Sequence, residues 1–151
     1  MPPPPARTPS RRKQDVLHRL EHDVDAWIAT ADGGAPYLVP LSFLWDGETL
    51  LISTPAASPT GRNLQATGRA RVGVGATRDV VMIDGTVRAL GEGEPPEAVG
   101  DAFAAKTGFD PRQLATPYRW FRIRPLRLQA WREANELAGR DLMRDGRWLV
   151  G

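Results

Sequence analysis

Apolar residues recur along the chain with a helical period first and an alternating period afterwards. From residue 10 onward, Val16, Leu17, Leu20 and Val24 fall on one face of a helix. Ser10 stands at the start of this pattern, where its hydroxyl oxygen can accept a hydrogen bond from a free helical N–H group. The pattern predicts an amphipathic helix over residues 10–23 with Ser10 as its N-cap.

Patterns typical of β-strands follow this helix. Asp-Gly pairs between apolar runs indicate tight hairpin turns, because glycine adopts the positive φ that these turns need. The runs cover residues 26–31, 37–45 and 49–54, and they are separated by Asp32-Gly33-Gly34 and by Asp46-Gly47. Residues 26–54 are therefore predicted to form a three-stranded antiparallel meander.

The second half of the chain continues with short strands and few helices. The predicted elements are a short helix over 62–67, strands over 71–76 and 80–89, a helix from Pro96 to about 107, strands over 118–124 and 126–132, and an edge strand within 145–150. Gly85 inside a strand indicates a bulge or a close approach by another group. Many short strands at regular spacing favour a mainly β fold with a closed or partly closed barrel.

Composition and charge narrow the classes of function. The 151 residues suit a single domain over 11–151, preceded by a Pro-rich segment over 1–10 that is expected to be a disordered tail. The chain has no cysteine, which excludes disulfides, thiolate nucleophiles and cysteine-ligated zinc. Residues 1–14 hold four cations and no acid, so the net charge of +2 leaves −2 on the remainder. Such a body is poorly suited to nucleic acid.

Neither a signal peptide nor a membrane-spanning stretch is recognisable. The first residues lack an apolar core, and the longest apolar runs are no longer than a strand. We therefore expect a cytoplasmic protein without membrane contact.

Two catalytic alternatives have weak support. His18-Arg-Leu-Glu-His22 fits the H-x-x-E-H pattern of inverted zinc metallopeptidases, but these are the only histidines and a third ligand would have to come from far downstream. A solvated helix face explains them as well. No G-x-S-x-G motif occurs, so the sequence does not indicate a serine hydrolase. Gly73-Val-Gly75 lacks the third glycine of the fingerprint that binds a dinucleotide.

Residues 53–64 carry the most informative pattern. The sequence Ser53-Thr-Pro-Ala-Ala-Ser-Pro-Thr-Gly-Arg-Asn-Leu64 ends a strand in hydroxyls, passes through a small-residue loop and begins a helix. A helix start offers free N–H groups and a positive dipole end to an anion. Ser58 and Thr60 add donors, and Arg62 adds a planar fork suited to phosphate. The segment is either a phosphate site or an ordinary capped helix with a surface arginine.

Residues from about 15 to 132 resemble the pyridoxamine 5'-phosphate oxidase-like, FMN-binding split β-barrel superfamily, and within it the flavin/deazaflavin oxidoreductase branch. Order and spacing of four stretches carry the resemblance. These are residues 27–31 with 36–40, residues 41–47, residues 53–64 with 69–72, and residues 121–131. Many relatives have a lysine two residues before the loop arginine, where this chain has Thr60, so the phosphate charge would rest mainly on Arg62.

The resemblance implies a homodimer with the cofactor at the dimer interface. The phosphate would lie near Ser58, Thr60, Arg62 and Asn63. The isoalloxazine ring would lie against the backbone of Val39, Pro40 and Leu41, above Ser53 and Thr54. Trp131 and Arg132 are candidates to complete the site of the partner subunit.

The resemblance also implies an oxidoreductase that needs no acid–base constellation, because the cofactor supplies the hydride chemistry. FMN and the deazaflavin coenzyme F-420 are both candidate cofactors, with a slight preference for F-420 because Arg69 and Arg71 could meet its acidic tail. The substrate would be a small organic molecule. The alternatives are a non-catalytic flavin- or heme-binding module of the same fold and an unrelated β-barrel interaction protein.

Overall fold

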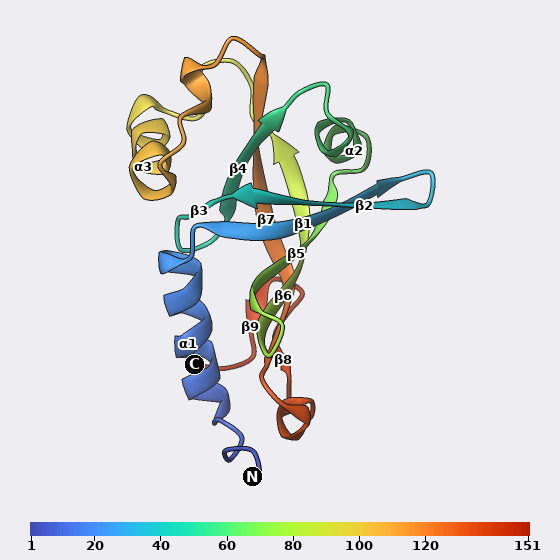
Figure 1. Cartoon of the computed structure of the whole chain (residues 1–151), viewed down its shortest axis with the longest axis vertical. Helices are drawn as coiled ribbons and strands as arrows, with labels where there is room; N and C mark the ends of the chain where they lie inside the picture. Colours follow the sequence, from blue (N-terminus) through green and yellow to red (C-terminus); the bar gives the residue numbers. More distant parts are fainter.

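A computed structural model describes residues 1–151 as a curled, nine-stranded sheet with three α-helices (Figure 1). The helices are α1 (Pro9–His22), α2 (Pro59–Thr67) and α3 (Glu97–Thr107), with short 3-10 turns η1 (Pro111–Gln113) and η2 (Ala134–Glu136). The strands are β1 (Asp25–Asp32), β2 (Ala35–Ser42), β3 (Leu44–Trp45), β4 (Leu50–Pro55), β5 (Arg69–Ala76), β6 (Asp79–Ala89), β7 (Tyr118–Trp131), β8 (Asp141–Arg144) and β9 (Arg147–Trp148). None of the helices combines the length and apolar character needed to cross a membrane.

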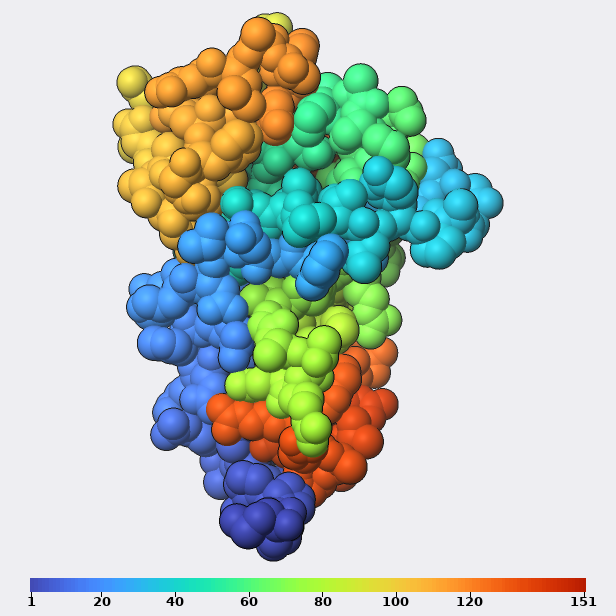
Figure 2. All heavy atoms as spheres, viewed as in Figure 1, coloured from blue at the N-terminus to red at the C-terminus, as the bar shows by residue number.

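The sheet is curled, and its strand order places β2 and β4, which are far apart on the path of the sheet, close together in space. Its main path is β2-β1-β5-β6-β7-β4-β3, and β8 and β9 extend from β7. β2 and β4 come side by side without pairing, so the two ends of the path approach each other. In Figure 1, α2 and α3 lie at one end of the molecule on either side of β4, and α1 lies at the other end. The tip of the β1–β2 hairpin projects from the body (Figures 1 and 2).

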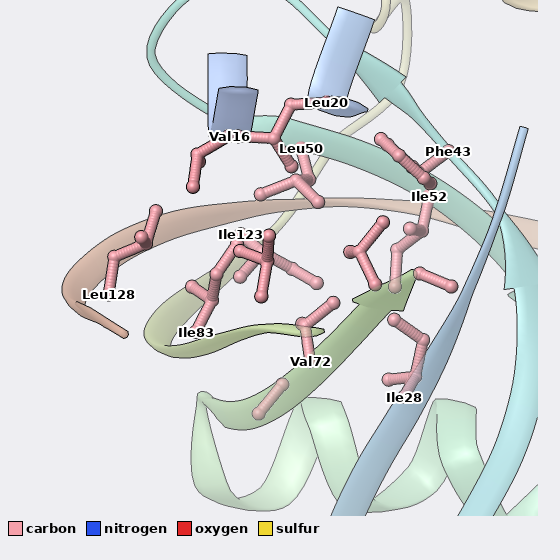
Figure 3. Packing of buried hydrophobic residues seen from close by; sticks show 14 of the residues in the cluster. Val16, Leu20, Ile28, Phe43, Leu50, Ile52, Val72, Ile83, Ile123 and Leu128 are labelled. Atoms are coloured by element: carbon pink, nitrogen blue, oxygen red, sulfur yellow. The ribbon is translucent and has the colours of Figure 1, made fainter. Parts of the chain in front are cut away.

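The main core fills the inside of this curl. Buried side chains from α1 and from the strands meet there, as the labelled residues in Figure 3 show. Val16 and Leu20 come from α1, and they are at most 1% exposed. They meet Leu50 and Ile123 of the sheet, so the predicted apolar face is confirmed for Val16 and Leu20. Leu17 is only half-buried, and Val24 lies beyond the helix, which ends at His22.

The predicted meander is correct for its first hairpin and only in part for its third strand, which pairs with the end of the second run at Leu44 and Trp45. β1 pairs with β2 from Asp25↔Ser42 to Asp32↔Ala35. The second run then breaks at Phe43, whose side chain is fully buried. β4 pairs with the two-residue β3 and with the distant β7, not with β2. Strands that are adjacent in sequence usually pair, but here β4 pairs along one edge with β7, which begins more than sixty residues later.

The strands predicted over 118–124 and 126–132 form one strand, β7, which bends at Pro125. Pro125 lies opposite Gly85, and the register with β6 shifts between Asp84 and Gly85. A Cβ on Gly85 would lie 2.7 Å from Ile123 Cγ2 and 2.9 Å from the Arg124 carbonyl oxygen. The expected bulge at Gly85 is therefore confirmed, and it also explains why a proline is tolerated within the strand.

The N-terminal boundary and cap need correction. α1 begins at Pro9, and its N-cap is Thr8, whose hydroxyl oxygen accepts a hydrogen bond from Arg11 N at 3.1 Å. The side chain of Arg7 is only 9% exposed and donates to both carboxylate oxygens of Glu136, at 3.0 and 2.7 Å. Residues 7–10 thus belong to the folded body and not to a disordered tail, because Arg7 finds a partner that local pattern cannot reveal.

Arg12 connects the same helix to the end of the chain. Its guanidinium is buried, and Nη1 donates to the carbonyl oxygens of Ala130, Glu136 and Gly139 at 3.1–3.2 Å. Burial lowers the pKa of Arg12. β8, absent from the sequence prediction, pairs with β7 in this region, and only β9 falls within the predicted 145–150 edge strand.

Two truncations separate residues 1–6, where the Pro4 carbonyl oxygen accepts one hydrogen bond from exposed Asn135 Nδ2 at 2.9 Å, from the more firmly anchored Arg7 and Thr8. Deleting residues 1–6 is expected to change the free energy of unfolding by no more than about 0.5 kcal/mol. Deleting residues 1–8 removes the Thr8 cap and leaves Glu136 without Arg7, which should cost about 3 kcal/mol or more. Urea unfolding of both variants measures the difference. Equal stability of the two truncations would contradict the anchoring role of Arg7.

Acid should weaken the same anchor. Hydrogen bonds from Arg7 are the main reason why the pKa of Glu136 falls from the ordinary 4.5 to about 2. The stabilisation that ionised Glu136 contributes is complete above pH 4.5 and is lost as the pH falls towards 2. The reason is that Glu136 has the higher pKa in the unfolded chain, which therefore takes up the proton first. The loss between pH 7 and pH 3 should be about 2 kcal/mol. Glu136→Gln should lack this loss, so its deficit relative to wild type in urea unfolding should shrink at pH 3.

Candidate functional site

The end of β4 and the start of α2 form a tight loop whose hydroxyls are already used. Ser58 is the N-cap of α2: its oxygen accepts from Gly61 N at 3.0 Å, and its hydroxyl donates to Pro55 O at 2.7 Å. Thr54 Oγ1 lies 3.3 Å from Ser58 Oγ. A Cβ at Gly61 would lie 2.5 Å from Pro55 O, so only glycine fits this approach. The hydroxyls therefore shape the loop before they can serve any ligand.

The donors left for an anion at this helix start are few. Pro59 has no N–H, Gly61 N is bonded to the cap, and Arg62 N donates to the Ser58 carbonyl oxygen. The N–H of Thr60 remains free, whereas the Thr60 side chain is 2% exposed and buried beneath the helix. The Arg62 guanidinium is exposed and donates from Nη1 to Ala57 O at 2.9 Å. One exposed guanidinium, one N–H group without a hydrogen-bond partner and the positive end of the helix dipole thus lie at the helix start, and this donor set is suited to a phosphate.

Asn63 lies one residue beyond these donors and ties α2 to the sheet. Its Nδ2 donates to Thr30 Oγ1 of β1 at 3.1 Å. Thr30 borders an open depression of about 410 Å³. Arg69 and Arg71, both exposed, also line this depression, and Arg71 is 3.6 Å from the Asp84 carboxylate. Two guanidiniums therefore lie beside the helix that carries the candidate phosphate site.

The strip of β2 that was predicted to contact the ring is an edge of the sheet. β2 pairs only with β1, so part of its backbone N–H and C=O groups has no partner in the sheet. Pro40 is exposed, and Val39 and Leu41 are half-buried. Pro40, Leu41 and Ser53 line one cavity of about 370 Å³. The fold therefore gathers nine of the eleven predicted residues around the end of β4, the start of α2 and the edge of β2.

Trp131 and Arg132 lie away from this group. Ser53 pairs with Trp120 near the start of β7, whereas Trp131 is the last residue of the same strand. Arg132 is held by Asp79 at 3.3 Å and by Asp15 at 3.7 Å. Within one chain these two side chains cannot belong to the site, and only a second copy could bring them there.

An apolar groove that the sequence prediction did not identify surrounds Trp131. It has a volume of about 380 Å³ and is lined by Trp27, Leu38, Val80 and Met82 among others. Trp27 is 52% exposed and Leu38 is 59% exposed. The alternation of residues in β1 could have indicated that Trp27 is exposed, because neighbouring residues of a strand face opposite sides and Ile28 is buried. Arg140 was also missed; its guanidinium lies 5.8 Å from the centre of the Trp131 ring.

The histidines lie on α1, outside the group around α2. The rings of His18 and His22 stack with their centres 4.1 Å apart, and His22 Nδ1 lies 2.8 Å from the His18 carbonyl oxygen. The residues around α2 thus offer donors and edge backbone for binding, and the chemistry of any reaction there would come from a bound group.

Solved structures share this fold at low sequence identity. A candidate pyridoxamine 5'-phosphate oxidase of Listeria innocua is 16% identical, with a TM-score of 0.66 over 80% of this chain and 98% of its own. An FAD-binding protein of Mesorhizobium loti is 21% identical, with a TM-score of 0.63 over 77% and 89%. An F420 reductase is 20% identical, with a TM-score of 0.59 over 74% and 93%. A search of curated protein sequences gave no significant match.

A sequence model of the family described as pyridoxamine 5'-phosphate oxidase matches residues 14–132. The matched segment begins in α1 and ends one residue after β7, so it contains the whole of the candidate site. The segment also agrees with the stretch, from about 15 to 132, over which the sequence resembles that superfamily. This chain therefore belongs to the pyridoxamine 5'-phosphate oxidase-like, FMN-binding split β-barrel superfamily.

Proposed function

We propose that the protein is an oxidoreductase that binds FMN or coenzyme F-420 and transfers hydride between this cofactor and a small organic substrate. The observation that carries the proposal is the exposed Arg62 guanidinium beside the free Thr60 N–H, at a helix start that faces the edge of β2. This arrangement would give the cofactor phosphate an anion site close to the edge strand β2. Membership of a family with flavin-binding relatives supports it.

The bound cofactor would supply the hydride chemistry, and the residues of this chain would bind and orient it. Arg62 would give the phosphate a charge-assisted pair of hydrogen bonds, and the Thr60 N–H would add one more. Val39 and Leu41 pair with Ile28 and Ala26 of β1, so it is the outward-facing C=O of Pro40, between them, that would pair with the polar edge of the ring. Ser53 and Thr54 are buried at the end of β4 and would close the floor of the site.

A homodimer would explain the exposed apolar groove. Trp27 and Leu38 project from the β1–β2 hairpin, and Met82 and Trp131 continue the same surface. A second copy that covers this surface would also bring Trp131 of the partner subunit towards a cofactor site. Arg132 is less suited to that role than Trp131, because Asp79 and Asp15 already hold it.

Arg69 and Arg71 are the observation that favours F-420 over FMN. F-420 carries an acidic tail beyond its phosphate, whereas FMN ends at the phosphate. Both arginines line the depression that begins at Thr30, next to Asn63 of α2. An acidic tail that leaves the α2 start in this direction would meet them.

Arg62→Ala should weaken cofactor binding at least about tenfold, because a charge-assisted hydrogen bond contributes roughly 1.5–3 kcal/mol. Arg62→Lys should recover only part of the loss, since an ammonium cannot form the planar fork. Visible-absorption titration with FMN and with F-420 measures this. Arg78→Ala, at an exposed arginine of the β5–β6 turn, is the control and should bind normally. If the wild type binds neither cofactor, the proposed function is wrong.

The double variant Arg69→Ser/Arg71→Ser should distinguish the two cofactors. Affinity for F-420 should fall about tenfold or more as two charge pairs are lost, and affinity for FMN should stay within about threefold. The same absorption titration applies. An equal loss for both cofactors would mean that the two arginines act on the fold or on the phosphate and not on the tail.

Sedimentation velocity at micromolar concentration should give a dimer, since a stable pair usually buries about 2,000 Å² or more. Leu38→Asp places a charge on the exposed groove and should shift the protein to a monomer, whereas Leu149→Asp, at an exposed leucine beyond β9, should not. A monomeric wild type would rule out the proposed homodimer.

A further inference from the structure

A cavity next to the candidate ring site has walls that neither the phosphate loop nor the sheet edge explains. Its volume is about 370 Å³, and one side is formed by Pro40, Leu41 and Ser53. Phe103 of α3, Phe109 and Tyr118 form the opposite side. In Figure 2, the segment from α3 to the start of β7 (yellow to orange) packs against the end of β2 and β3 (cyan). The cavity therefore lies between the cofactor-facing strands and this added segment.

The aromatic wall is held in place before any ligand arrives. The Phe103 ring meets the Trp120 ring edge-on at 5.0 Å, and the Phe109 ring lies 5.7 Å from the Tyr118 ring. Thr107 Oγ1 donates to Phe103 O and accepts from Phe109 N, which fixes the turn between the two phenylalanines. Fixed rings bind a flat partner at a lower entropic cost than mobile ones.

Lys106 and Arg112 fasten this wall to the rest of the protein. Lys106 Nζ donates to the carbonyl oxygens of Leu20 and Phe43, at 3.2 and 3.1 Å. Arg112 donates to Asp110 and Asp101, so η1 stays against α3. Both cations are thus directed to partners outside the cavity.

The cavity lining carries a negative charge and no positive one. Asp25, the first residue of β1, is the only ionisable acid in the lining, and the hydroxyl of Ser42 donates to its Oδ1 at 2.7 Å. The lining contains no arginine, lysine or histidine. A phosphate or carboxylate placed here would meet a like charge and no counter-charge, whereas an amine would find a partner.

We infer that this cavity receives an aromatic group of the substrate that is uncharged or cationic, and that it rejects phosphorylated and carboxylated rings. The inference rests on the proposed function, because the cavity shares Pro40, Leu41 and Ser53 with the expected ring site. The aromatic walls select a flat group, and Asp25 sets the preference for charge. Pyridoxamine 5'-phosphate itself, an anionic ligand, does not suit such a cavity.

Three probes with one ring system test the charge preference: 2-naphthylmethylamine, 2-naphthylmethanol and 2-naphthoate. Each is titrated against the full chain by calorimetry, without cofactor and with saturating FMN or F-420. The amine should bind at least about tenfold more tightly than the carboxylate, with the alcohol between them. Asp25→Asn should reduce the amine-to-carboxylate ratio to within about threefold. Asp32→Asn, at the exposed acid on the other end of β1, should leave the ratio unchanged.

Phe109→Ala provides the second readout, because it should weaken all three probes about equally while the ratio stays. Wild-type binding that does not depend on probe charge, or an equal effect of Asp25→Asn and Asp32→Asn, would overturn the inference. If the cofactors bind but the charge preference is absent, the cavity inference fails and the proposed function stands. If the preference is present but neither cofactor changes the absorption spectrum, the proposed function fails and the cavity stands.

Discussion

Strand β7 pairs with β6 along one edge and with two different strands along the other, and the curl of the sheet depends on this exchange. β4 pairs with residues Tyr118 to Ile123, and β8 pairs with Leu128 and Gln129. The change of partner occurs around Pro125, where β7 passes Gly85 too closely for any side chain at that position. One missing Cβ thus allows β7 to bend at the bulge while its pairing with β6 continues on both sides of it.

The bend has a direct effect on the candidate site. Because β4 pairs with the first part of β7, its hydroxyl-bearing end reaches the side of the sheet where β2 forms the edge. The loop that follows can then place α2 against β1 and β2. Ser53, Arg62 and Pro40, which come from three separate stretches of sequence, lie on neighbouring elements for this reason. The candidate phosphate donors come from one short stretch of sequence, but the residues around them are brought there by long-range strand pairing.

Sequence reasoning succeeded where a signal is local and failed where a partner is distant. The apolar face of α1, the Asp-Gly hairpin, the bulge at Gly85 and the loop before α2 each depend on residues within one short stretch. The pairing of β4 with β7 and the hold of Glu136 on Arg7 depend on contacts across the whole chain.

Within the site, the loop around Ser58 and Arg62 could be found from sequence, because caps and helix starts have local patterns. The burial of the Thr60 side chain could not, since it depends on which face of α2 meets the sheet. The groove around Trp27 and Leu38 was also not predicted, although the alternation of residues in β1 indicates that Trp27 faces away from the core. An exposed tryptophan opposite a buried isoleucine becomes informative only when the strand is known to have a free face.

The anchors of α1 determine the order in which the molecule can assemble. Arg12 lies in the first helix of the chain and Arg7 lies just before it, yet they have partners at Glu136, Gly139 and Ala130. Contacts that close a loop of this length carry an entropic cost that local contacts do not, so we expect them to form after the local ones. During synthesis, α1 is made first, and Arg7 can already pair with Asp15, but Glu136 and the carbonyl acceptors of Arg12 come only with the chain after β7 and its last residues. The helix that begins the chain is therefore among the last elements to be fixed in place.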